Sequence, residues 1–304
     1  MHITVSSSDV GKRLDKVVPE MLPDISRNQI QKMIKDGLVT VNDRQVLPHC
    51  FLKEGDVVRV TEKKPQEIKN IQPVPEFRVF FECADYLVID KPPGLVAHAG
   101  AHTTTQTLVD QLLERYPTLR QVGEDPMRPG IVHRLDKEAS GVMVIAKTQS
   151  SFESLVRQFK LRQVKKQYAI LVYGHVEPTE GVIDLPITRS KQQYTRRAAG
   201  RNDGRQAVTR YWVERLIGNT SLVRVQPETG RTHQIRVHFF AKGNPIVGDP
   251  LYVSKKIKKI ASGRLMLHAE LLGFHDLAGE WREYTIPPND DFQNILKQVE
   301  TARD

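Results

Sequence analysis

The chain has 304 residues, of which 39% are hydrophobic and 27% charged, so it is long enough for two globular domains and is neither disordered nor fibrous. Its formal net charge is +9, from 45 Lys and Arg against 36 Asp and Glu. No apolar run approaches the ~18 residues of a membrane helix. With only Cys50 and Cys83, a disulfide framework is excluded and a reducing cytoplasm is expected.

The positive charge is concentrated in one stretch. Residues 151–236 carry 16 basic and 7 acidic side chains, which accounts for the whole net charge. The densest part is RSKQQYTRRAAGRNDGR, which includes Arg196 and Arg197. Clustered cations gain free energy by displacing counterions from phosphates, which favours a polyanion-binding surface here over a solvated basic loop.

The first 64 residues predict a small helix-plus-sheet domain. Ile30, Met33 and Ile34 lie on one stripe of a predicted helix that ends at Gly37. Short alternating segments at 39–41 and 57–60 predict strands. Residues 65–75 contain three prolines and no apolar period, so we expect an extended linker there.

The remainder, 76–304, predicts an α+β domain with a mostly antiparallel sheet and flanking helices. Strands are expected at 78–81, 86–90, 141–147, 168–173 and 222–225, and helices at 107–115 and after Ser150. Ser150 and Glu153 have the spacing of a capping box for the second helix. The strands do not alternate regularly with crossover helices, which argues against a doubly wound sheet.

The string GIVHRLDKEASG places His133, Arg134 and Asp136 just before the predicted buried strand at 141–147. Side chains in such a position are held by a rigid scaffold and still reach a cleft. An ionised Asp there is a candidate nucleophile or a stabiliser of positive charge. From spacing alone, the alternative is a surface ion-pair network.

A second string, ETGRTHQIRVHFFAKG, predicts a loop followed by a helix, which begins near Thr232 and ends at Gly243. Arg231 and Arg236 are five residues apart, so on a helix they diverge by roughly 140°. Only one of them can serve a given buried carboxylate, and the pattern leaves open which one.

Other common sites find no support in the sequence. It contains no phosphate-binding GxxxxGK[ST] loop, no GxGxxG after a strand and no GxSxG elbow. The pair His98 and His102 has no carboxylate or cysteine at metal-ligand spacing, so we expect no metal site.

Taken together, several ordered strings resemble the RluA family of RNA pseudouridine synthases over most of residues 76–290. They are LVIDKPPGLVAHAG, HRLDKEASG, KKQYAILVYG, GRTHQIRVH, GNPIVGDPLY and LMLHAEL. The amino-terminal string SRNQIQKMIKDGLVTVNDRQV resembles the S4 RNA-binding domain. One departure is Ala139, where the family more often has Thr; it leaves the acidic residue intact and bears on local packing.

The resemblance implies roles for single residues. It makes Asp136 the catalytic acid and Arg236 the partner of the carboxylate. It makes Tyr168 an active-site residue that stacks on the base, with proton abstraction as the alternative role. It places Arg134 in the stack that an extruded uridine leaves behind. The remaining residues expected to bind RNA are His133, Arg231, Arg196 and Arg197 in the larger domain and Arg27 and Lys32 in the S4-like domain.

The function that the resemblance implies is isomerisation of uridine to pseudouridine in structured RNA, without metal or other cofactor. Large-subunit ribosomal RNA, free or in a pre-ribosomal particle, is the expected partner of a monomeric cytoplasmic enzyme. The alternatives are the same chemistry on transfer RNA, or a non-catalytic RNA-binding or ribosome-assembly protein with the same fold. A glycoside hydrolase would need a second catalytic acid, which these strings do not supply.

Overall fold

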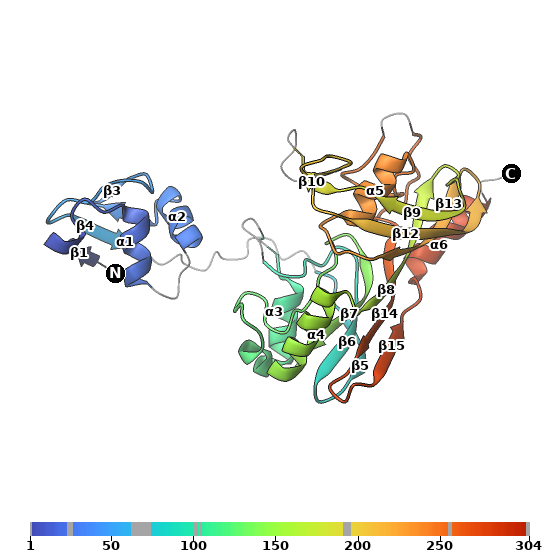
Figure 1. Ribbon diagram of the computed structural model, residues 1–304, viewed down its shortest axis with the longest axis horizontal. Coiled ribbons are helices and arrows are strands. Elements are labelled where there is room, and N and C mark those ends of the chain that lie inside the picture. The colour runs from blue at the N-terminus through green and yellow to red at the C-terminus, as the bar shows by residue number, and fades with distance from the viewer. Residues whose placement is uncertain are drawn as a thin grey trace. The chain divides into compact units, whose positions relative to one another are not determined.

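The computed structural model divides the chain into two compact units, Met1–Asn70 and Ile71–Asp304. The division falls within the expected linker, most of which lies outside the described residues. Each unit is described by itself (Figure 1). The described residues are 2–22, 27–61, 74–99, 103, 105–190, 196–254 and 257–301.

The amino-terminal unit packs two helices on a four-stranded sheet. The helices are α1 (Leu14–Met21) and α2 (Arg27–Lys35), and Ile30 and Ile34 of α2 are fully buried in a core with Val39 and Val58. The stripe expected from the sequence is therefore the buried face of α2. The sheet has the order β1-β4-β2-β3, with strands at His2–Thr4, Val57–Val60, Val39–Val41 and Arg44–Gln45.

The larger unit is built on a nine-stranded sheet in which, among the described strands, every pair is antiparallel except β7 with β14. The order is β5-β6-β7-β14-β8-β13-β12-β9, and β15 pairs with the second half of β14. The expected α+β class with a mostly antiparallel sheet is thus confirmed. In the same order, the strands span Arg78–Glu82, Tyr86–Lys91, Ser140–Ala146, Leu267–His275, Lys165–Tyr173, Thr220–Pro227, Val208–Ile217 and Glu180–Asp184, with β15 at Trp281–Thr285.

Strand β7 runs through the centre of the core. All seven of its residues are buried, as its continuous apolar sequence predicts. Its neighbours approach closely at Gly141, where φ is +115° and an added Cβ would lie 2.1 Å from the carbonyl oxygen of Ala269. Glycine is therefore required where the HRLDKEASG string enters the sheet.

The helices of this unit are α3 (Leu108–Arg115), α4 (Gln149–Leu161), α5 (Gln234–Lys242) and α6 (Asp290–Thr301). Helix α4 packs on β7 and α6 on β12 (Figure 1). A two-stranded hairpin, β10 (Ile187–Arg189) with β11 (Arg197–Ala199), lies against α5. In the described part of the chain, no helix has the length and apolarity to span a membrane.

The expected capping box of α4 is wrong. The N-cap is Thr148, whose hydroxyl accepts a hydrogen bond from the backbone N–H of Ser151 at 3.3 Å. Ser150 already lies in the first turn, so it cannot serve as the cap. Thr148 and Ser151 have the same three-residue spacing as Ser150 and Glu153. The extended backbone of Thr148 shows that the helix begins after Thr148.

Candidate active site

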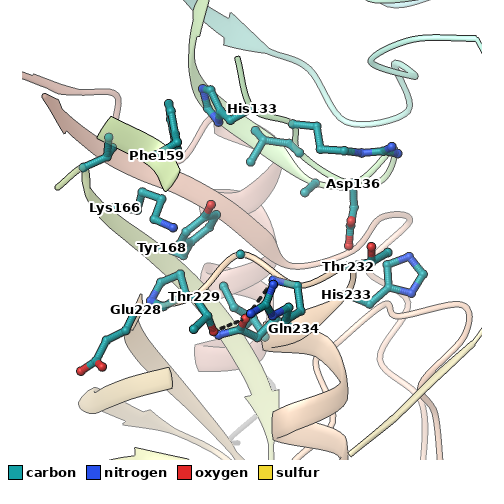
Figure 2. Close-up of a pocket in the computed structure, with 18 of the residues that line it drawn as sticks. His133, Asp136, Phe159, Lys166, Tyr168, Glu228, Thr229, Thr232, His233 and Gln234 are labelled. Atoms are coloured by element: carbon teal, nitrogen blue, oxygen red, sulfur yellow. Dashed lines mark hydrogen bonds between the residues drawn. The ribbon is translucent and has the colours of Figure 1, made fainter. Parts of the chain in front are cut away.

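A pocket of about 790 Å³ brings together residues that are far apart in the sequence (Figure 2). It is lined by the loop that precedes β7, the end of α4, the start of β8, the loop after β13 and the start of α5. Six of the residues expected from the sequence line it: His133, Arg134, Asp136, Tyr168, Arg231 and Arg236.

Arg236 anchors the centre of the site. It lies in α5, and its guanidinium is fully buried. Its Nη1 donates to Oδ2 of Asp136 at 3.0 Å, and the Asp136 side chain keeps 19% exposure toward the pocket. Of the two arginines that the spacing left open, Arg236 therefore contacts the carboxylate, and the other, Arg231, lies at the pocket surface.

Asp249 holds Arg236 from the opposite side. The Nε and Nη2 atoms of Arg236 donate to its two carboxylate oxygens, both at 2.8 Å, and the Asp249 side chain is fully buried. Burial opposes the charge of Arg236, but the hydrogen bonds to Asp249 and the charges of Asp249 and Asp136 raise the pKa of the guanidinium above its ordinary value. The arginine therefore presents a permanent positive charge to Asp136.

The loop after Asp249 tightens this arrangement. Oδ1 of Asp249 also accepts the backbone N–H groups of Leu251 at 2.8 Å and Tyr252 at 2.9 Å. The Tyr252 ring lies 5.4 Å from the Arg236 guanidinium, within the range of a cation–π contact. The sequence analysis assigned no role to Asp249, although the string GDPLY contains it. The feature that could have identified it is an acidic residue beside a tight turn.

Beneath the Asp136 loop lies a fully buried lysine. Lys91 ends β6, and its Nζ donates to the carbonyl oxygens of Pro92 and Leu95 at 2.9 Å and of Lys137 at 3.2 Å. Burial lowers the pKa of Lys91 to about 7, while the negative charge of Asp136 opposes that change. The lysine thus ties the residue after Asp136 to the end of β6.

Tyr168 lies on β8 and points into the pocket (Figure 2). Burial and the nearby charge of Asp136 raise the pKa of its phenol well above the ordinary value. The phenol is therefore neutral at physiological pH and offers an aromatic face and a hydroxyl group rather than a phenolate.

His133 forms a neutral wall of the pocket. Its Nε2 accepts the backbone N–H of Val144 at 3.0 Å, and its ring stacks on Phe159 at 4.6 Å. Burial, with a smaller effect of Lys166, lowers its pKa to about 3, so the imidazole carries no charge at neutral pH. Next to it, Arg134 is exposed and lies 3.3 Å from Nε2 of His98.

The loop that carries Arg231 is fixed by Gln234. The side-chain oxygen of Gln234 accepts hydrogen bonds from the Thr229 hydroxyl at 2.6 Å and from the Arg231 N–H at 3.0 Å. Its amide nitrogen donates to the Val208 carbonyl at 2.9 Å. These bonds connect the loop after β13 to β12 and hold Arg231 at the pocket surface.

Arg196 and Arg197 are not among the residues that line the pocket. The backbone N–H of Arg197 donates to the Tyr252 hydroxyl at 2.7 Å, and the guanidinium of Arg196 lies 5.6 Å from the Tyr252 ring. The Nε of Arg196 is buried and has no hydrogen-bond partner among the described residues. Arg27 and Lys32 belong to α2, but their side chains lie outside the described residues.

The arrangement can present an oriented, ionised carboxylate to a neutral ligand in a partly desolvated pocket. Such a group can attack a carbon atom or accept a proton. In the part of the chain that the structure describes, no three His, Cys, Asp or Glu side chains are grouped as metal ligands would be.

Comparison with known proteins gives two family matches. Residues 85–241 match the family model for RNA pseudouridylate synthase, and residues 12–58 match that for the S4 domain. An RNA pseudouridine synthase of Aquifex aeolicus is 40% identical over 301 residues, covering 95% of this chain and 94% of the relative. The ribosomal large subunit pseudouridine synthase D of Xanthomonas campestris is 39% identical over 315 residues, covering 97% and 91%.

A solved structure supports the same assignment. Human RNA pseudouridylate synthase domain containing 1 is 25% identical, with a TM-score of 0.59, over 79% of this chain and 97% of the human chain. Both family models, the full-length relatives and the fold agree with the resemblance seen in the sequence. The chain therefore belongs to the RluA family of RNA pseudouridine synthases, which are isomerases, and carries an amino-terminal S4 domain.

Proposed function

We propose that this protein converts uridine to pseudouridine in large-subunit ribosomal RNA, with Asp136 as the catalytic carboxylate. The observation that carries the proposal is the 3.0 Å contact between Asp136 and the buried Arg236 in the pocket that Tyr168 also lines. The names of relatives such as the Xanthomonas enzyme support the choice of RNA.

The reaction is redox-neutral and needs no metal or other cofactor. The bond between N1 of uracil and C1′ of ribose breaks, the uracil rotates, and C5 bonds to C1′ while the proton on C5 is lost and N1 gains one. A carboxylate serves this sequence by bonding covalently to the sugar or the base, or by taking a proton. For each of these roles the carboxylate of Asp136 must be aimed into the pocket, and the 3.0 Å contact with Arg236 orients it.

The target base has to leave its helical stack before it reaches Asp136. Extrusion costs a few kcal/mol, and least where the base is already unpaired. In this proposal Arg134 fills the vacated stack with its planar guanidinium and Tyr168 stacks on the base; the exposure of Arg134 and the position of both residues in the pocket lining support these roles. His133 contributes a neutral wall, and the half-buried Arg231 a charge for the RNA backbone.

We propose that each domain expected from the sequence has its own role. Residues 1–64 form the S4 domain, which binds RNA through Arg27 and Lys32; residues 65–75 are a linker; and residues 76–304 carry the catalysis. Arg196 and Arg197 extend the RNA surface beyond the pocket. We further propose that the enzyme acts as a monomer in the cytoplasm during ribosome biogenesis, on the RNA itself or on a pre-ribosomal particle.

Tritium release tests the proposal. Transcripts of bacterial large-subunit ribosomal RNA with 5-tritiated uridine should release tritium with the wild type, in EDTA. Asp136→Asn should reduce the rate by about a thousandfold or more, because the amide is neither ionised nor nucleophilic. Glu138→Gln is the matched control, since its carboxylate also lies near Arg236, at 3.6 Å, and it should remain within about fivefold of wild type.

Three results would contradict the proposal. Equal release by the wild type and Asp136→Asn would remove Asp136 from catalysis. Release from transfer RNA but not from ribosomal RNA would favour the first alternative substrate, and no release from either would favour an RNA-binding protein. Carbodiimide-blocked primer extension on the treated RNA then identifies the modified nucleotide.

A further inference from the structure

Basic side chains gather at the mouth of the pocket, between the end of α4 and the loop after β13. Arg162, Lys166, Arg205 and Arg231 line it, as does Lys160 in the last turn of α4. No ion pair joins any of the first four to another described residue, and the Nε of Arg231 donates only to the carbonyl of Gln206, at 3.0 Å.

The two acids that line the same pocket are already paired. Asp136 is bound by Arg236, and Glu228 by Arg210. The four cations therefore have no carboxylate of the described chain to neutralise them. A cluster of like charges without acidic partners is a binding surface for an anion from outside.

The backbone of Arg162 points to a role for its side chain. Arg162 is the C-cap of α4, with φ 61° and ψ 31°, the left-handed conformation that glycine adopts most easily. An arginine is strained there, and the exposed side chain packs into no core. The helix end alone would therefore favour glycine, and what arginine adds is a charge at the pocket mouth.

The charges also act on one another. Burial and then the charge of Arg162 lower the pKa of Lys166. Burial, then Arg205 and Arg162, lower the pKa of Arg231. These side chains, which line one pocket, therefore repel one another, and a bound anion relieves the repulsion.

Lys166 lies on the side of Tyr168 that is away from Asp136 (Figure 2). Lys166 and Tyr168 are two residues apart on β8, so their side chains share one face of the sheet. Tyr168 experiences the charge of Asp136, whereas Lys166 experiences that of Arg162. In Figure 2, Tyr168 lies between Lys166 and Asp136. A uridine whose base reaches Asp136 thus leaves its sugar-phosphate at the cations.

We propose that Arg162, Lys166, Arg205 and Arg231 form a phosphate-binding site for the RNA backbone that flanks the target uridine. The proposal rests on the proposed function for the identity of the polyanion. In this proposal the four residues contact the RNA backbone and hold the strand. Arg162 and Lys166, the second lysine of the KKQY string, are then RNA-binding residues beside the active site.

The sharpest test is Arg162→Gly in the full chain. Glycine relieves the left-handed backbone, so the midpoint of thermal unfolding should be unchanged or higher, whereas a purely structural arginine would not behave in this way. With the tritiated ribosomal transcript, kcat/KM should fall about tenfold, mainly through KM. In filter binding, the salt dependence of log Kd should become shallower by about 0.7–0.9 for each phosphate that the variant no longer neutralises.

Three further variants complete the test. Lys166→Met keeps the length of the side chain without its charge and should lower RNA affinity in the same way. Lys297→Met removes an exposed lysine of α6, outside the pocket lining, and should leave affinity and salt slope unchanged. Arg162→Lys should recover part of the affinity, since it restores the charge.

The possible outcomes separate this inference from the proposed function. If the wild type releases tritium and both charge-removing variants keep its KM and salt slope, the phosphate site is wrong and the activity stands. If the wild type releases none, filter binding with the same transcript still decides: shallower salt slopes for Arg162→Gly and Lys166→Met support the site, and slopes equal to that of Lys297→Met overturn it.

Discussion

Arg236 is held by Asp249 through two hydrogen bonds of 2.8 Å, and only its third nitrogen, Nη1, is left for Asp136 at 3.0 Å. The buried Asp249 thus fixes the plane of the guanidinium, and the guanidinium in turn orients the partly exposed carboxylate. Asp249 is a positioning residue in this arrangement, because it acts on Asp136 through Arg236.

Asp249→Asn tests this relationship. The amide keeps the size of the side chain but leaves the buried Arg236 with only Asp136, at 3.0 Å, and Glu138, at 3.6 Å, as anionic partners. Breaking a buried ion pair costs about 3–5 kcal/mol, so we expect a loss of that order in the free energy of unfolding, measured with urea. The value of kcat should fall more than KM rises, because Asp136 loses its orientation. A stability equal to that of Glu138→Gln would show that Asp249 is dispensable.

Tyr168 should not act as a phenolate. Its pKa lies well above the ordinary value because of burial and the charge of Asp136. If the phenolate were the catalytic base, kcat would rise about tenfold for each pH unit below that pKa. We expect kcat, measured by tritium release between pH 6.5 and 9 (roughly the range around neutrality in which the phenol stays neutral), to show no such rise. A tenfold rise per unit that disappears in Tyr168→Phe would contradict this expectation.

Lys91 predicts a pH dependence of stability. Its pKa is 10.5 in an unfolded chain and about 7 when folded, because burial disfavours the ammonium. Between these values the unfolded chain binds a proton that the folded chain does not. The free energy of unfolding should therefore rise with pH in this window, by up to about 1.4 kcal/mol per unit from this group, and this contribution should be flat below pH 7.

The variant Lys91→Met removes that contribution. It also leaves three carbonyl oxygens without their donor, which costs about 1–3 kcal/mol at every pH. The quantity to measure is the difference in unfolding free energy between wild type and Lys91→Met at pH 7 and pH 9.5. A difference that grows with pH agrees with the expectation, and one that is independent of pH would refute it. Lys297→Met, which alters an exposed lysine, is the control.

Local patterns predicted much of the fold. The apolar run at 141–147 predicted a strand buried on both faces, and β7 is such a strand, because a continuous apolar sequence has no face for water. The stripe at Ile30 and Ile34 likewise predicted the buried side of α2. The start of α4 was predicted wrongly, since Thr148 and Ser150 offer the same hydroxyl and only the backbone distinguishes them.

The sequence by itself determined the family and the candidate residues of the site, because Asp136, Tyr168 and Arg236 stand in ordered strings whose spacing survives without coordinates. Tertiary structure alone decided how they work together. Arg236 and Asp136 are 100 residues apart, and the fold brings Arg236 of α5 against the loop before β7, whereas Arg231 lies in the loop that precedes α5. The part played by Asp249, the neutral state of Tyr168 and the cations beside Arg162 follow from burial and charge in three dimensions, which no local pattern records.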